Sequence, residues 1–310
     1  MEFKLSCNGK DITKYVISYD WSGALEQAGR KLNFSLVTNP YDANFVNADL
    51  KLGDTVEFYG DNILLFSGKI WCMDRKTDSY TYEYVAYDNL IYAAKSKLHQ
   101  KFENSTVKNV INYVASQYNL GIKSLCEDCD RIVSFIADGM TGTEIIKKAL
   151  ELLYEQTQKK YHIIYIQNQI LVIPETEVIE QYNIIAGQNL ISASHSASLE
   201  DMVNKVIITD KDGNKIGEVS NNNDLQYGCI QDFYKIDEKK DSNQAAKAML
   251  KSVKENTSVQ AVGNVQCIAG YSVYLQVEDI KARFRIVSDS HKISNNMHTM
   301  DLTLDFKEVV

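Results

Sequence analysis

The chain has 310 residues, of which 45% are hydrophobic and 24% are charged, as in globular proteins that bury sizeable cores in two or three domains. Its formal net charge of -8 argues against a nucleic-acid groove, because backbone binding depends on Lys and Arg side chains that neutralise phosphates. No run of about 18 apolar residues predicts a membrane span, and the N-terminus lacks a signal-peptide pattern, so we expect synthesis in the cytoplasm.

Alternation of apolar and polar residues dominates the first third of the chain. Asn8-Gly9 lies between two short alternating runs, which is a strong hairpin signal. In a later run, Leu32, Phe34 and Leu36 share one face. These patterns predict antiparallel strands with one buried side.

The stretch from Gly53 to Asp88 gives the clearest strand pattern. Its alternating apolar positions are Val56, Phe58, Leu64, Phe66, Tyr80, Tyr82, Tyr84 and Tyr87. Turn residues separate the runs, which is typical of antiparallel strands. Gly68 inside one run suggests a bulge or a close backbone approach. We predict that residues 1–95 form a β-barrel module and that Gly53, Phe66, Gly68 and Asp88 determine its fold.

After Asp88 the hydrophobic period changes from two to about three and a half. Helices are predicted from Asn89 to Lys97, around Val107 to Tyr118 with Ser105 or Thr106 as N-cap, and from an N-cap at Thr143 to Leu153. Two apolar runs on either side of Gln167-Asn-Gln then predict a hairpin. Residues 96–188 are therefore interpreted as an inserted α+β domain of ααββ order.

The β pattern returns in residues 189–310, interrupted by one amphipathic helix predicted over 242–256. The spacing from Gly270 to Phe284 to Asp305 resembles that from Gly53 to Phe66 to Asp88. This similarity favours two diverged copies of one β module, although alternating segments also recur by chance. The predicted fold class is α+β, mainly β, with two β-barrel modules flanking the inserted domain.

The six cysteines are scattered, which predicts free thiols in an intracellular protein. Cys126 and Cys129 have the C-x-x-C spacing by which one loop can present two thiolates to zinc or form a redox pair. No second C-x-x-C and no H-x-x-x-H pair follows, and acidic neighbours disfavour a thiolate. We interpret the pair as incidental or loop-stabilising, keep a metal or redox site as the weaker alternative, and expect no cofactor.

His291 and His298, with Asp289 and Asp301 nearby, could assemble an acid-base or metal site. We favour a polar hairpin loop between two strands, because Asn295-Asn296 is typical of a turn. A glycan hydrolase that uses carboxylates near His291 remains the alternative function.

A carbohydrate-binding module would need exposed aromatic side chains, for which Trp21 and Trp71 are the candidates. Both lie in strand or turn contexts, where packing is the simpler interpretation.

The order of several short motifs resembles the XkdQ and YqbQ type of prophage tail proteins, which are related to the late-control protein D family. The matching segments are Leu52-Gly-Asp-Thr-Val, Leu65-Phe-Ser-Gly-Lys-Ile, Tyr87-Asp-Asn-Leu, Ala149-Leu, Lys159-Lys-Tyr-His-Ile, Ser198-Leu-Glu-Asp-Met-Val-Asn-Lys-Val, Gly228-Cys-Ile-Gln, Gln244-Ala-Ala-Lys-Ala, Ile286-Val-Ser-Asp-Ser-His and Met297-His-Thr-Met. They extend over nearly the full chain. The segment Gly228-Cys229-Ile230 departs from the pattern, which prefers Leu after the glycine, and Cys126 and Cys129 have no counterpart in it.

The resemblance implies a non-enzymatic baseplate hub of a contractile phage tail or R-type bacteriocin. It implies two tail-tube-like barrels in each chain and a homotrimer that joins a six-fold tail tube to a three-fold spike. The implied partners are the tail tube protein, the spike protein, and tape-measure and LysM-type tail proteins. It implies no specific nucleic-acid binding and a location in the virion tail. Gly270, Phe284 and His291 would be fold-determining residues of the second module.

Overall fold

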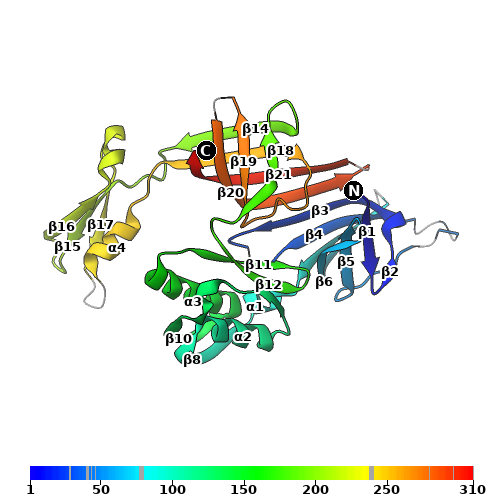
Figure 1. The fold of residues 1–310 in the computed structure, drawn as a ribbon, viewed down its shortest axis with the longest axis horizontal. Coiled ribbons are helices and arrows are strands. Elements are labelled where there is room, and N and C mark those ends of the chain that lie inside the picture. The colour runs from blue at the N-terminus through cyan, green and yellow to red at the C-terminus, as the bar shows by residue number, and fades with distance from the viewer. Residues whose placement is uncertain are drawn as a thin grey trace. The chain divides into compact units, whose positions relative to one another are not determined.

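The computed structural model describes residues 1–309 apart from 28, 40, 41, 43, 46, 77–79, 237–240, 279 and 296. The chain forms two compact units, one of Met1–Ala193 with Ser258–Val310 and the other of Ser194–Thr257. Strands predominate, as Figure 1 shows, so the prediction of a mainly β protein with helices is confirmed.

The N-terminal β module contains seven strands, joined in antiparallel pairs. They are β1 (Phe3–Cys7), β2 (Lys10–Asp11), β3 (Val16–Ala24), β4 (Lys31–Val37), β5 (Thr55–Gly60), β6 (Ile63–Lys76) and β7 (Thr81–Asp88), with a short 3-10 helix η1 (Thr13–Tyr15). Their spatial order is β3-β4-β7-β6-β5-β1-β2. Alternate side chains point inward, and Leu32, Phe34 and Leu36 of β4 are all buried.

The C-terminal β module contains six strands: β13 (Val178–Ile185), β14 (Leu190–Ser198), β18 (Lys254–Val262), β19 (Ser272–Val277), β20 (Ile280–Ser294) and β21 (Met297–Val309). Their order is β14-β18-β21-β20-β19-β13. When the strands of the two modules are matched by their order along the chain, β13 corresponds to β1, β14 to β3, and so on to β21 and β7. The spatial order of the C-terminal module is then the same as β3-β4-β7-β6-β5-β1. The first strands differ in direction, since β13 runs parallel to β19 whereas β1 runs antiparallel to β5. The common order supports the predicted duplication.

Backbone hydrogen bonds repeat in the two modules. The N–H of Gly53 donates to the carbonyl of Ile70 at 2.8 Å, and the N–H of Gly270 donates to that of Ile286 at 2.9 Å. Both glycines have positive φ, +88° and +105°, which favours a residue without a side chain. In each module the register shifts directly after this isoleucine.

These bonds make Ile70 equivalent to Ile286 and therefore align Phe284 with Gly68. The predicted match between Phe66 and Phe284 is wrong by two residues. Phe284 pairs with position 306, as Gly68 pairs with Asp88, so the predicted match of Asp88 with Asp305 is wrong by one. Spacing counted along a sequence cannot locate such offsets, because loops and bulges add residues outside the paired positions.

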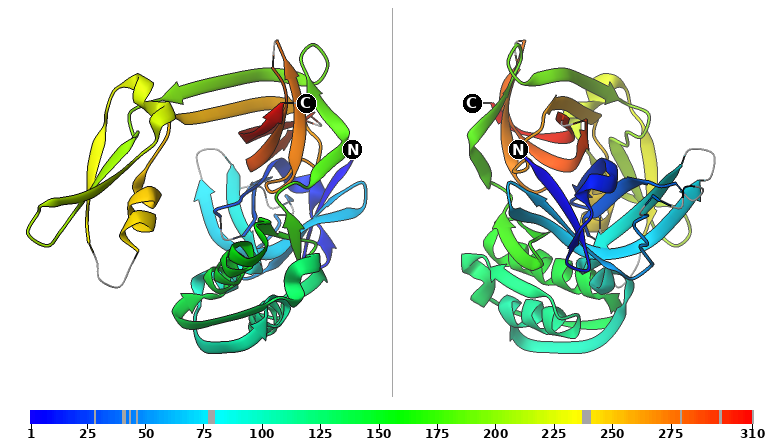
Figure 2. Two further views of the ribbon diagram at one scale, coloured as in Figure 1. Left: turned by 60° about the vertical axis from the view of Figure 1, so that its left-hand side comes forward. Right: turned by 90° about the vertical axis from the view of Figure 1, so that its right-hand side faces the viewer.

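The two modules share one sheet instead of forming two closed barrels. Strand β20 pairs with β19 over Ile280–Arg285 and then with β3 over Ser288–Ser294. The N-terminal strands, blue in Figure 2, therefore lie beside the orange and red C-terminal strands. Within the described residues no sheet closes on itself, which corrects the prediction of closed barrels.

Between the modules, a cluster of helices packs on two small sheets. Its elements are α1 (Leu90–Lys95), β8 (Lys97–Thr106), α2 (Val107–Gln117), β9 (Gly121–Ser124), η2 (Glu127–Asp130), β10 (Ile132–Thr141), α3 (Gly142–Thr157), β11 (Tyr161–Ile166) and β12 (Gln169–Pro174). Thr106 caps α2 as predicted. The cap of α3 is Thr141 rather than Thr143, because Thr141 forms a capping box with Glu144. Among the described residues, no helix is long and apolar enough to cross a membrane.

The second unit is a three-stranded sheet with one helix. It contains β15 (Lys205–Thr209), β16 (Lys215–Ser220), η3 (Asn222–Tyr227), β17 (Gln231–Lys235) and α4 (Ser242–Met249). Asp241 caps α4, accepting the N–H groups of Asn243 and Gln244. The helix is shorter than the predicted 242–256, because the chain becomes extended at Leu250 and enters β18 at Lys254.

Candidate functional site

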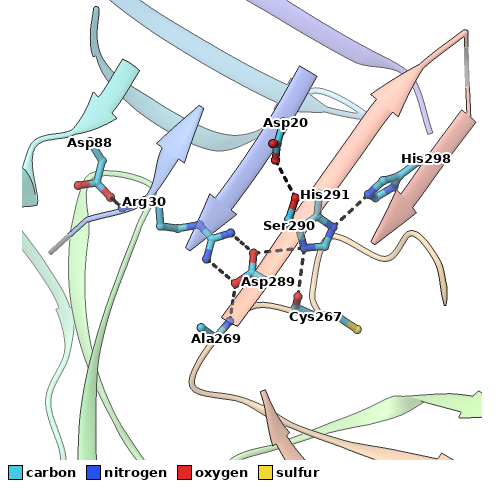
Figure 3. A network of polar contacts seen from close by, with 9 residues as sticks. All are labelled: Asp20, Arg30, Asp88, Cys267, Ala269, Asp289, Ser290, His291 and His298. Carbon is cyan, nitrogen blue, oxygen red and sulfur yellow. Dashed lines mark hydrogen bonds and ion pairs between the residues drawn. The ribbon is translucent and has the colours of Figure 1, made fainter. Parts of the chain in front are cut away.

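A buried polar network joins the two β modules where β3 and β4 meet β20 (Figure 3). At its centre, Arg30, directly before β4, forms an ion pair with Asp289 in β20. The side chains are 8% and 0% exposed, and the guanidinium contacts both carboxylate oxygens, with Nη1 to Oδ1 at 3.0 Å. The guanidinium also lies 4.2 Å from the ring centre of Trp21. Such a pair is stable only because both charges are satisfied.

Backbone donors complete the network. Asp289 accepts the N–H of Ala269 at 2.7 Å, and Asp88 accepts the N–H groups of Arg30 at 2.8 Å and Leu90 at 3.0 Å. Burial raises the pKa of Asp88 to about 7, while these N–H groups act in the opposite direction. The predicted importance of Asp88 thus has a structural basis, since its carboxylate ties β4 to the first turn of α1.

His291 is fully buried in β20, with both ring nitrogens in contact. Its Nε2 lies 3.1 Å from the carbonyl of Cys267, and its Nδ1 lies 3.1 Å from Nε2 of His298. Because a carbonyl can only accept, Nε2 of His291 carries the proton and Nδ1 accepts from His298. Burial is the main cause that lowers the pKa of each histidine to about 4.

The predicted hairpin is present, with a turn at Asn295, whose φ is +49°, but the polar loop is shorter than predicted and does not include the two histidines. His291 lies within β20 and His298 within β21. The two strands are antiparallel neighbours, and Ser290 lies opposite Asp301 in their ladder. The predicted turn residue Asn296 lies outside the described residues. A strand with polar side chains resembles a loop in sequence, because the partners that satisfy those side chains are distant along the chain.

The arrangement suits structural joining better than acid-base chemistry. Asp289 is neutralised by Arg30, and Asp301 bonds Lys292 at 2.7 Å. One cavity of the first unit, of about 510 Å³, has no Asp, Glu, His, Lys or Arg among the described residues that line it, whereas another of about 480 Å³ is lined in part by Asp20, Glu83 and Lys292. The described lining of the first of these cavities lacks the two carboxylates that a glycosidase uses, and Asp20 and Glu83 of the second are the pair on which the hydrolase alternative would rest. Among the described residues no cluster of three or more His, Cys, Asp or Glu could hold a metal ion.

Cys126 and Cys129 form a disulfide across η2. The prediction of free thiols is therefore wrong for this pair, whereas Cys7, Cys72, Cys229 and Cys267 are free. The two cysteines are three positions apart in the sequence, and the 3-10 turn brings their Cα atoms to 5.4 Å, which is within disulfide range. Thiols joined in this way cannot ligate zinc.

The other predicted positions lie in cores and turns. Phe66 and Phe284 are buried. A side chain at Gly68 would meet the carbonyl oxygen of Tyr87 at 2.2 Å, so Gly68 marks a close backbone approach, and the register shifts of its strand lie on either side of it, at Leu65 and Trp71. Trp21 is 2% exposed and offers no open ring for a sugar, whereas Trp71 is half-buried and packs against Tyr87 and Tyr92, in line with the packing interpretation.

Comparison with known proteins identifies the family of this chain. The profile of the YQBQ-like family matches residues 19–305. The chain belongs to the YQBQ-like family. Over 306 residues it is 26% identical to the phage-like element PBSX protein XkdQ of Bacillus subtilis (strain 168), covering 94% of this chain and 92% of XkdQ.

Solved structures share the fold of this YQBQ-like chain. The 43 kDa tail protein of prophage MuSo2 from Shewanella oneidensis has a TM-score of 0.76 at 11% identity, with 98% of each chain covered. The E. coli c3393 protein, a component of the type VI secretion system with structural similarity to the T4 tail proteins gp27 and gp5, has a TM-score of 0.57 at 8% identity. The match covers 98% of this chain and 77% of c3393.

Sequence reasoning missed the central pair of the network in this YQBQ-like protein. Arg30 lies in a polar stretch of the sequence, and its partner Asp289 is 259 residues away, so no local pattern links them. The one local signal was Asp88 directly before a predicted helix, where a carboxylate commonly accepts N–H groups of the first turn.

Proposed function

We propose that this protein is a structural baseplate hub of a contractile tail, in a phage or a phage-tail-like bacteriocin. Three copies would form a ring that connects the six-fold tail tube to the three-fold spike. The full-length similarity to XkdQ, named as a protein of a phage-like element, and the shared fold with a prophage tail protein support a place in a tail.

One observation carries the adapter role: each chain contains two β modules with the same strand order. A three-fold spike and a six-fold tube cannot match with one contact per subunit, but three chains with two similar modules supply six quasi-equivalent contacts. The buried Arg30–Asp289 pair fixes the two modules of one chain in a single sheet, as a ring of equal modules requires.

The proposed partners follow from this position. The tube protein would contact one side of the ring and the spike the other, with tape-measure and LysM-type tail proteins as further neighbours. We propose domains at 1–95, 96–188 and 189–310, with the one change that strand β13 (Val178–Ile185) joins the C-terminal module, and with the middle segment outside or beneath the ring.

Counting subunits in the assembled particle tests the adapter role. Cryo-electron microscopy of purified tails should show one ring with three copies of this chain and six β modules. Six copies in the ring would contradict the proposal. A cell-wall zymogram of the purified protein should show no lytic band, whereas a clear band would favour the hydrolase.

A further inference from the structure

Inside one chain, an edge strand of each module pairs with the other module. At its opposite edge, each module has a strand equivalent to its partner's paired strand, and these two strands do not pair with each other. Inside the chain, β3 of the N-terminal module pairs with the second half of β20. The strand order makes β14 equivalent to β3 and β6 equivalent to β20. In each chain, therefore, β3 and β20 pair with each other, whereas the equivalent strands β14 and β6 do not.

We infer that β14 of one chain pairs with the second half of β6 in a neighbouring copy, and that this strand pairing closes the ring. The inference rests on the proposed trimer and names the edges that hold it together. It extends an existing interface, because β14 and β6 would repeat the pairing that β3 and β20 already make.

Both edges are open in the described part of the chain. Strand β14 ends the sheet, with β18 as its one partner, and its residues Ile191 to Ala197 are all exposed. Strand β6 pairs with β5 up to Lys69, after which β7 is its one partner over Cys72–Arg75. The side chain of Asp49 approaches Arg75 at 4.0 Å, an exposed ion pair that an incoming strand could displace.

The sequence of β14 leaves this edge unprotected. Its nine residues, LISASHSAS, contain no Lys, Arg, Asp, Glu or Pro, which are the residues that proteins use to block unwanted pairing. By contrast, the short edge strand β2 consists of Lys10 and Asp11. A long, uncharged edge that is exposed on both faces is a surface for adding another strand.

The repeated hydrogen bonds also fix the register. The N–H of Thr38 donates to the carbonyl of Tyr80, and the N–H of Gly263 donates to that of His298, both at 2.9 Å. Thr38 is thus equivalent to Gly263, and six residues earlier Leu32 is equivalent to Thr257.

Trp21 of β3 lies opposite Leu32, and His195 of β14 bonds Thr257 at 3.0 Å. Trp21 is therefore equivalent to His195, and the two nine-residue strands align from end to end, VISYDWSGA with LISASHSAS. Both contain Ile and Ser at the second and third positions.

This alignment predicts which residues meet between copies. Inside the chain Ser288 lies opposite Ala24. Ser288 follows the register shift after Ile286, as Cys72 follows the shift after Ile70, so Cys72 is its equivalent. Ala24 is equivalent to Ser198. In the ring, Cys72 of one copy should lie opposite Ser198 of the next.

Cysteine cross-linking tests this register directly, because Cys72 is an exposed free thiol. The test protein carries Ser198→Cys and Cys229→Ser, the latter to remove the other exposed thiol. Residues directly opposite in a sheet lie within the Cα distance that a disulfide spans. Mild oxidation of assembled tails should link the chains covalently, up to three per ring.

Two matched variants serve as controls. Ser192→Cys lies in the same strand, about 20 Å from Ser198 at roughly 3.3 Å per residue, and should not link to Cys72. Adding Cys72→Ser to the Ser198→Cys protein should abolish the link.

A backbone test separates pairing from side-chain effects. Leu25 donates its N–H to Val287 of β20, so by alternation the N–H of Gly23 also faces β20, and that of its equivalent Ala197 faces the open edge. Ala197→Pro removes this donor where an edge strand tolerates proline. The variant should keep the wild-type melting temperature as a monomer and fail to form trimers, whereas Ala197→Ser should form them.

The outcomes distinguish the edge pairing from the hub itself. If tails contain three copies per ring but Ser198→Cys gives no link, or Ser192→Cys links equally well, the edge pairing is wrong and the trimeric hub stands. If the particles contain another number of copies, the proposed function fails first.

Discussion

At the scale of single residues, the buried ion pair between Arg30 and Asp289 is the polar contact between the modules that a substitution tests best. Replacing Arg30 with Met leaves the Asp289 carboxylate buried without its partner, which typically costs about 3–5 kcal/mol. We therefore expect Arg30→Met to lower the free energy of unfolding by that amount in urea titrations.

The second half of this test removes the unpaired negative charge of Asp289. Adding Asp289→Asn to Arg30→Met keeps an oxygen for the N–H of Ala269 and should restore part of the loss. Lys101→Met, which breaks an exposed pair with Glu103, should change stability by less than about 0.5 kcal/mol. Equal losses for the double and single variants would contradict the role of the charge.

His291 and His298 predict a dependence of stability on pH. The folded-state pKa of each, about 4, is below the unfolded value of 6.5, so the unfolded chain binds more protons between these pH values. The free energy of unfolding should therefore decrease as pH falls from 6.5 to 4. For the fully buried His291 the loss is on the order of 3 kcal/mol.

Two measurements check this prediction. NMR titration of the imidazole signals should give midpoints near 4 for both histidines, and a midpoint near 6.5 for His291 would refute the buried neutral pair. Asp88 works in the opposite direction, because its folded pKa is raised to about 7 and its protonation stabilises the folded state. The histidine signals are thus a cleaner test than total stability.

Gly68 shows how close two strands approach. A Cβ atom at this position would lie 2.2 Å from the carbonyl oxygen of Tyr87, and neither backbone can move without breaking ladder hydrogen bonds. Gly68→Val should lower the free energy of unfolding by about 1–3 kcal/mol, measured by thermal denaturation. Gly217→Ala, whose nearest neighbouring atom would be 3.6 Å away, is the control. An unchanged melting temperature for Gly68→Val would show that the strands can separate.

At the scale of elements, the disulfide across η2 closes a very short loop. Chain-entropy arguments give about 2 kcal/mol for a loop of this size, so Cys126→Ser should destabilise the protein by no more than that. Cys229→Ser, at an exposed free thiol, should have no measurable effect. Alkylation followed by mass spectrometry should find Cys126 and Cys129 protected until a dithiol reductant is added.

Sequence alone predicted the elements whose signals are local. The helices α2 and α3 appeared through their apolar period, and the hairpin of β11 and β12 through the turn residues around Gln167. Strands β8 and β10 were missed, because exposed side chains such as Ile136 interrupt the alternation and their pairing depends on a partner about 30 residues away. Propensity carries no information about such partners.

The candidate site was the least predictable part. Asp88 and His291 were singled out, but their partners Arg30 and Cys267 come from other elements and are brought near by the sheet order alone. The same holds for β20 and β3, which pair across more than 250 residues of sequence. Repeats can be suspected from spacing, whereas register requires the hydrogen bonds.

At the scale of the whole molecule, the duplication explains the place of the second unit. In the N-terminal module residues 25–30 connect β3 to β4, and in the C-terminal module residues 199–253 connect the equivalent β14 to β18. The second unit is therefore an insertion into a hairpin that can close with a short turn. Its own buried core consists of Val206, Ile208 and Ala246 with a few partly buried neighbours.

This comparison predicts that the insertion can be removed. Replacing residues 199–253 with the six-residue sequence of 25–30 should leave the first unit folded, because the large apolar cores of both β modules lie outside the insertion. Calorimetry should show one cooperative transition close to that of the full chain, and circular dichroism should retain the strand signal. Replacing 97–141 by the same six residues is the contrasting control, since that segment supplies much of an apolar core to the first unit. If removing 199–253 unfolds the first unit, the two β modules are not equivalent, and the strand pairing proposed between copies loses its basis.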